Sequence, residues 1–448
     1  MAEAGAESGE ERARDLGALA TLRSVLALER DVLVLSVAMF AFSLGFQMTS
    51  RYVPRYMSLL GAGGVAIGLY GSVGNLIGAA YPYPGGALSD RVGSRTALTA
   101  FGLAATVGFL VWLAAPAFGT VVVPPVHLGP IDLDPIVLPV GIFLGLFLAQ
   151  AWKSLGLGAT FAVVKQAVPP ERLATGFAST ETVRRLAFLL GPLTAAALIA
   201  AFGFQLGFRA VLAIAAAFGL AATLVQRRFY DPGGDTVGKS FAGVSQIVAD
   251  LRSMPSALPP LLAGDTLVRF ANGMVYVFTV IVVTEFLSVS ATLPVVGYLS
   301  PDALFGVLLA VEMVVALVSM VPVARLADRV GLKPVVALGF AVYAVFPILL
   351  INAPADPWIV GLLFAFSGLR FAGLPAHKAL IVGPAERDAG GRVTGAYYLV
   401  RNALTIPSAL VGGWLYTAVS PGFAFTVATG VGLLGTGIFL AFGKRFEA

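Results

Sequence analysis

The chain has 448 residues, of which 58% are hydrophobic and 12% are charged, and its formal net charge is +5. A soluble domain carries roughly twice that charged fraction, so the composition indicates a multi-pass membrane protein. In such a chain the basic excess reports topology and not nucleic-acid binding. Because there is no cysteine, disulfides and thiolate metal sites are excluded, and two distant histidines argue against a zinc enzyme.

Apolar segments long enough to cross a bilayer recur along the chain. A membrane-spanning helix needs about 20 apolar residues. We expect twelve such helices, at residues 32–50, 64–85, 97–117, 136–164, 173–201, 207–225, 258–286, 303–324, 335–352, 357–383, 393–417 and 422–442. The sequence therefore predicts an all-α membrane protein.

A polar stretch near mid-chain divides these helices into two sets of six. We expect a cytoplasmic N-terminal segment (1–31), a first six-helix half (32–225), a cytoplasmic linker (226–257), a second half (258–442) and a cytoplasmic tail (443–448). Lys and Arg concentrate in the segments that this arrangement places inside, whereas the outer segments hold only Arg51, Arg55 and Arg209. This asymmetry predicts that both termini are cytoplasmic. We expect the plasma (inner) membrane of a prokaryote.

A charged turn occurs twice, once in each half. Asp90-Arg91 is followed by Gly93 and Arg95 between the second and third spans, and Asp328-Arg329 is followed by Gly331 and Lys333 between the eighth and ninth. Two copies at corresponding positions indicate an internal duplication.

This turn resembles the loop between helices two and three of the major facilitator superfamily, whose leading glycine corresponds to Gly86. In the second copy, Ala324 replaces that glycine. The resemblance implies two six-helix bundles related by a pseudo-two-fold axis. It also implies a gating role for these loop residues: Gly86, Asp90, Arg91, Gly93, Arg95, Asp328, Arg329 and Gly331. A glycine at position 86 would let another helix approach closely.

Several basic residues lie within the predicted spans, where ionisable groups are costly and so point to function. Lys153 in the fourth span corresponds to Arg370 in the tenth. His377 lies seven residues after Arg370, so a continuous helix would put both on one face, and Lys378 follows it. In the superfamily, spans one, four, seven and ten line the central cavity, which implies that these four residues lie beside substrate. The alternatives are structural ion pairs or packing contacts, and snorkelling to the headgroups for Lys378.

Acidic residues within the spans are fewer. Glu312 has no basic residue within four positions, so we predict that it exchanges protons, with Glu181 as a second candidate; the alternative is a protonated structural glutamate. The remaining buried charges are expected to pair. Glu181 is within reach of Arg184 and Arg185, Asp265 and Arg269 are four residues apart, and Arg401 stands alone in its span.

Gly191-Pro192 in the fifth span predicts a helix kink and resembles a helix-five pattern of superfamily exporters. The resemblance implies a secondary transporter that works by alternating access. We expect coupling to the proton gradient with no cofactor or metal, a lean towards efflux by antiport, and a monomer in the lipid bilayer. Because bases outnumber acids in the spans, the small-molecule substrate is expected to be an organic anion.

Other functions stay open at this stage. The apolar, Phe-rich spans suit a drug or neutral-solute (sugar) exporter, and a receptor or sensor derived from a transporter would keep the same turns. No nucleophile–base set is visible in the sequence, so we do not expect an enzyme.

Overall fold

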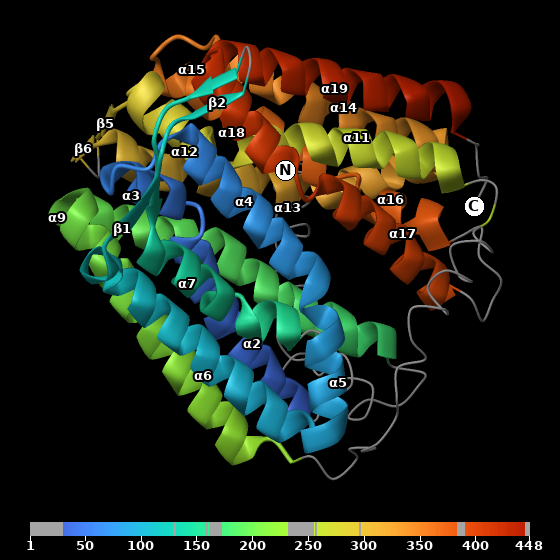
Figure 1. The fold of residues 1–448 in the computed structure, drawn as a ribbon. Helices are drawn as coiled ribbons and strands as arrows, with labels where there is room; N and C mark the ends of the chain where they lie inside the picture. Colours follow the sequence, from blue (N-terminus) through green and yellow to red (C-terminus); the bar gives the residue numbers. More distant parts are fainter. Residues whose placement is uncertain are drawn as a thin grey trace, which may run out of the picture.

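The structure is a computed structural model that describes residues 30–128, 131–156, 160, 173–231, 255, 258–294, 297–382 and 390–443. Two helical bundles lie against each other, one from each half of the chain (Figure 1). Of the predicted segments, 1–29 and most of the linker 226–257 lie outside the described residues, as does 444–448. Residues 226–229 of that linker continue a helix.

The first half consists of helices with two small β-ribbons. Its elements are α2 (Arg30–Thr49), α3 (Val53–Leu59), α4 (Gly64–Ala80), α5 (Pro82–Val92), α6 (Ser94–Leu113), the 3₁₀ turn η1 (Ala115–Phe118), β1 (Thr120–Val123), β2 (Val126–Leu128), β3 (Ile131–Leu133), β4 (Ile136–Pro139), α7 (Val140–Ala149), the π-helical turn η2 (Ala151–Leu155) and α9 (Leu173–Phe229). Strand β1 pairs antiparallel with β4, and β2 with β3.

The second half repeats this plan with one ribbon. Its elements are α11 (Leu258–Tyr276), α12 (Thr279–Ile281), the π-helical turn η4 (Val282–Phe286), β5 (Ala291–Leu293), β6 (Gly297–Leu299), α13 (Pro301–Val330), α14 (Leu332–Ile351), α15 (Pro357–Gly368), the 3₁₀ turn η5 (Leu369–Phe371), α16 (Leu374–Val382), α17 (Gly390–Thr405), α18 (Ser408–Ala418) and α19 (Pro421–Phe442). Strands β5 and β6 pair antiparallel.

Seven described helices are long and apolar enough to cross a bilayer, and α11 with the bent segment Thr279–Phe286 makes an eighth. Each of the twelve predicted spans overlaps a described helix. Helix α9 holds two of them, because the chain turns at Gly203, whose φ is +73°. Several others are broken, at Pro82 between α4 and α5 and at Pro407 between α17 and α18. The fourth begins late, since residues 136–139 form β4.

Small residues bring the two halves into close contact. Gly68 of α4 faces Ala409 and Gly413 of α18, and a Cβ atom at Gly68 would overlap the Ala409 carbonyl oxygen. In the same way, Gly306 of α13 lies against the Pro192 carbonyl of α9. Helices that lack a hydrophobic driving force between them associate through such small-residue packing. The halves are therefore joined along α4–α18 and α9–α13.

This packing predicts the effect of a large side chain at Gly68. Gly68→Leu inserts its side chain into the α4–α18 contact, so we expect a loss of about 1–3 kcal/mol of stability. Thermal unfolding in detergent measures it. The matched control is Gly430→Leu, because Gly430 of α19 has no neighbour within 4 Å of an added Cβ atom. Equal melting temperatures for the two variants would contradict the close contact.

Candidate functional site

A cavity of about 300 Å³ lies between the two halves, and its described lining is rich in basic residues. Its charged side chains come from both halves: Arg51, Arg184 and Arg185 from the first, and Glu312, Arg370 and Lys378 from the second. Glu312 is the only acid among the described residues of this lining. Of the predicted substrate residues, the structure thus places Arg370 and Lys378 in the central cavity.

Glu312 and Arg370 form a buried ion pair, with side chains that are 7% and 4% exposed, respectively. The Glu312 carboxylate also accepts a hydrogen bond of 2.6 Å from the Ser367 hydroxyl. Gly368 lets the two helices that carry the pair approach each other closely, because a Cβ atom at this position would be only 2.5 Å from the Glu312 carbonyl oxygen. Arg370 itself lies in η5, where the helix between α15 and α16 is interrupted. Glu312, which has no basic residue within four positions along the sequence, is therefore paired with a residue from another segment of the chain.

Two guanidinium nitrogens at this cavity are buried and make no hydrogen bond to any described residue. They are Nη1 of Arg51 and Nε of Arg370. The Arg51 guanidinium stacks on Tyr276, 3.8 Å from the ring centroid. A buried donor without an acceptor is costly, and in native proteins it calls for an explanation such as a ligand or an ordered water. Both nitrogens belong to residues that line the cavity, one from each half.

The fifth predicted span contributes two further bases to the same lining. Arg184 approaches the Phe188 ring at 5.2 Å, and Nη1 of Arg185 lies 2.8 Å from the Met320 sulfur. The side chain of Glu181, their predicted partner, lies outside the described residues. The arginines therefore face the inter-half space, in contact with residues of both halves.

A second group of charges surrounds Asp265, which is fully buried. Its carboxylate is 3.3 Å from Arg269 and 3.1 Å from Arg401, and it accepts a hydrogen bond of 3.1 Å from the Tyr397 hydroxyl. The predicted Asp265–Arg269 pair is confirmed as part of this larger network. Arg401, which has no acidic partner in its own span, pairs with Asp265 of another helix.

His377 belongs to this network and not to the central cavity. Its Nε2 atom is 3.3 Å from Asp265 without hydrogen-bond geometry. Arg370 and His377 line one small pocket together with residues of α14, as their spacing of seven predicts, although Arg370 lies in the 3₁₀ turn η5 and α16 begins at Leu374. His377 does not line the central cavity. His377 instead lines a third cavity of about 570 Å³, which shares Leu374 and Lys378 with the central one.

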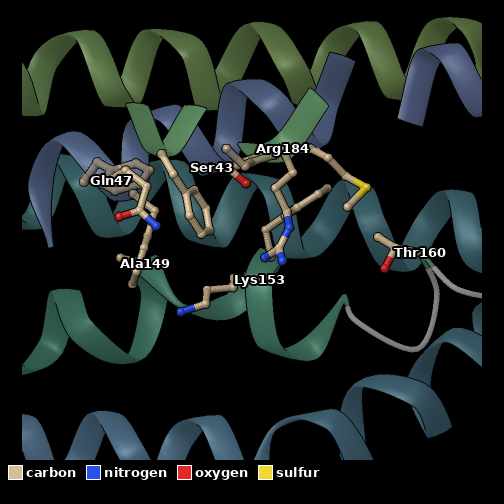
Figure 2. Close-up of a pocket in the computed structure, with 12 residues that line it drawn as sticks. Ser43, Gln47, Ala149, Lys153, Thr160 and Arg184 are labelled. Carbon is tan, nitrogen blue, oxygen red and sulfur yellow. The ribbon is translucent and has the colours of Figure 1, made fainter. Parts of the chain in front are cut away.

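Lys153 lies in a side pocket of about 180 Å³ within the first half (Figure 2). It projects from the π-helical turn η2, and its ammonium is 4.2 Å from the centroid of the Phe46 ring. The pocket shares Gln47, Arg184 and Phe188 with the central cavity. Lys153 thus lies beside the central cavity rather than in its wall.

Ion pairs join the two halves at the end of the molecule where α3, β5 and β6 lie (Figure 1). Arg55 pairs with Glu285 and, at 3.0 Å, with Asp302. The Ser58 hydroxyl donates to Glu285 at 2.6 Å, and the Tyr52 hydroxyl donates to the Asp302 carbonyl at 3.1 Å. We call these five residues the latch. Both Glu285 and Asp302 come from the second half, so the latch holds this end closed.

The repeated charged turns lie at the opposite end. Gly93 and Gly331 adopt φ values of +82° and +86°, which favour glycine. Arg95 donates to the Arg227 carbonyl at 2.7 Å, and Lys333 donates to the Leu440 carbonyl at 2.8 Å. Each base therefore caps the C-terminal carbonyls of the last helix in its own half, as the helix dipole favours.

The acidic and basic pairs in front of these glycines, Asp90-Arg91 and Asp328-Arg329, are exposed. The close helix contact expected at Gly86 is wrong in this conformation, because nothing lies within 4 Å of an added Cβ atom. Gly85 instead lies against the Leu155 carbonyl. The gating role of the turns stays a prediction.

Gly191 and Pro192 lie in the interior of α9. Helical geometry continues through Pro192, and the non-helical residue inside α9 is Gly203. Gly191 faces Gln47 at 2.8 Å from an added Cβ atom, so it brings α9 close to α2. Its visible role is close packing beside the cavity.

The chain is similar to known membrane transporters both in sequence and in fold. The model of the family described as Major Facilitator Superfamily matches residues 261–447. An uncharacterized MFS-type transporter of Methanocaldococcus jannaschii is 20% identical over 430 residues, which cover 93% of this chain and 95% of the relative.

Among solved structures, the nucleoside transporter NupG superposes with a TM-score of 0.71 at 12% identity, covering 92% of this chain and 100% of that one. A POT family transporter in complex with 5-aminolevulinic acid gives 0.70 at 14% identity, covering 94% and 99%. At these identities the likeness shows the fold.

The latch predicts which end opens when it is broken. Arg55→Ala removes both ion pairs, so we expect the α3 end to open more often. The chain has no cysteine, so Leu309→Cys introduces a single reactive thiol in the wall of the central cavity. Opening of the α3 end would be seen as faster labelling of this thiol by a reagent added on the α3 side. Arg209→Ala, an exposed cation of the same half, is the control. An unchanged labelling rate in Arg55→Ala would contradict the latch.

Proposed function

We propose that this chain is a membrane transporter of the major facilitator type and that it carries a small organic anion by alternating access; the family match over residues 261–447, the relative and the shared fold support the first part. The observation that carries the proposal is the pair of orphan donors on Arg51 and Arg370, one in each half, at a cavity whose described lining has five bases and one acid. An anionic group between them would satisfy both donors through charge-assisted hydrogen bonds. Binding across the two halves suits a site about which they rock.

In this account the structure is the inward-facing state. The latch closes the α3 end, whereas the third cavity adjoins the central one and is lined by residues of α5 and α17. Figure 1 shows α5 and α17 diverging at this other end. The distribution of Lys and Arg assigns that end to the cytoplasm. Anions would therefore exchange here with the cytoplasm and, after the halves rock, with the outside.

The Glu312–Arg370 pair supports proton coupling through Glu312. Its carboxylate and a substrate anion compete for the same guanidinium. When Glu312 takes up a proton, Arg370 is released to bind the anion, and by reciprocity a bound anion favours proton uptake. Proton and anion then travel together. The coupling we propose is therefore co-transport, in place of the antiport that the Gly191-Pro192 pattern suggested.

An exporter of apolar neutral drugs accounts less well for this site, because a neutral apolar molecule leaves the two buried donors unsatisfied at a cost of about 1–3 kcal/mol each. A sensor that binds without transport would share the site. Flux across a membrane separates it from a transporter.

The test is anion uptake into proteoliposomes with an inward proton gradient. Arg51→Gln removes the charge and an orphan donor, so we expect uptake to fall by at least tenfold, the equivalent of about 1.5–3 kcal/mol for a charge-assisted bond. Arg51→Lys should retain part of the activity. Arg228→Gln, an exposed arginine at the end of α9, is the matched control.

Two results would overturn the proposal. One is uptake of neutral solutes or organic cations but of no anion. The other is anion uptake that Arg51→Gln leaves at the level of Arg228→Gln.

A further inference from the structure

The side pocket of the first half has five aromatic rings in its walls. They are contributed by Phe42, Phe46, Phe109, Trp152 and Phe188. Trp152 stacks on Phe42 with 4.5 Å between ring centroids, and its indole nitrogen lies 3.4 Å from the Gln226 side chain, which fixes that wall. The pocket is about 180 Å³. An engineered apolar cavity of about 150 Å³ binds benzene, so this pocket has room for one aromatic ring.

Two cations face this space. Figure 2 shows Lys153 and Arg184 reaching into the pocket from two different helical segments, η2 and α9. Lys153 already lies over Phe46, and the described lining contains no acid. A cation is attracted to the face of an aromatic ring by the ring's quadrupole. The pocket therefore favours an aromatic ring over an aliphatic ring of the same size.

The pocket adjoins the central cavity. Gln47, Arg184 and Phe188 line both. Arg51 follows Gln47 by four residues at the end of α2 and lines the central cavity with Arg370. A single molecule can thus place a ring in the side pocket and direct an anionic group towards the arginines.

The geometry points to a substrate that is an aromatic organic anion, with its ring in the side pocket beside Lys153. This inference rests on the proposed anion transport and specifies its substrate class. The π-helical turn η2 carries both Trp152 and Lys153, and π-helical turns are frequent at functional sites. Lys153 acts here on the ring, whereas Arg51 and Arg370 act on the charge.

Three probes of one charge test the inference: phenylacetate, cyclohexylacetate and acetate. Their binding to the purified protein is measured by isothermal titration calorimetry. We expect phenylacetate to bind on the order of tenfold more tightly than cyclohexylacetate, the range of a desolvated cation–π contact, and acetate to bind most weakly.

A matched pair of variants assigns the ring preference to its residue. Lys153→Met keeps most of the length of the side chain and removes the charge, so the preference for phenyl over cyclohexyl should disappear while binding of acetate is kept. Lys378→Met, in the wall of the central cavity, should weaken all three probes alike. Thermal unfolding of each variant without ligand verifies that it is folded.

Each contrary outcome has a distinct meaning. Equal affinities for phenylacetate and cyclohexylacetate in the unaltered protein would overturn the aromatic assignment and leave anion transport standing. A preference that survives in Lys153→Met would also overturn it. If none of the three probes binds, nor any other anion, the proposed function itself fails.

Discussion

The ion pair between Glu312 and Arg370 is the constraint on which the rest of the site depends. Two opposite charges that are about 95% buried are costly to desolvate, and removal of either partner alone leaves an uncompensated charge that costs roughly 3–5 kcal/mol. In the transport cycle we propose, Arg370 therefore leaves Glu312 when a proton neutralises the carboxylate and another anion takes its place. This exchange alone would be sufficient to make a transporter move a proton and an anion together.

Three basic residues of the site lie where the regular helices are interrupted or end. Arg370 lies in a 3₁₀ turn between α15 and α16, Lys153 in a π-helical turn after α7, and Arg51 beyond the end of α2. Irregular backbone is tolerated at membrane depth where it lines a cavity or is buried in protein. Regular helices meet the other need, close contact between halves, through small residues such as Gly68 and Gly306. The latch then decides which end of the molecule is closed.

The sequence was sufficient for much of the fold. Hydropathy predicted where the spans lie, and the twin turns at Gly93 and Gly331 predicted the duplication, because both signals are local. The partners of the buried charges could not be predicted, since Glu312 and Arg370, or Asp265 and Arg401, meet only after distant helices pack. Arg51 was interpreted as an outer-loop base, and no local pattern marks it as a cavity residue. The Ser367-Gly368 pair beside Arg370 is a local pattern that fits the ion pair, because the serine hydroxyl donates a hydrogen bond to Glu312 and the glycine allows the close approach of its backbone.

The most direct test of the account is the number of protons exchanged when an anion binds. Calorimetric titration of the most tightly bound monocarboxylate, in buffers of different ionisation enthalpy, gives this number. Anion binding frees the Glu312 carboxylate from Arg370, so the account predicts net proton uptake in the unaltered protein and its loss in Glu312→Gln. Binding without proton exchange, or with proton release, would contradict the linkage of anion and proton at this ion pair.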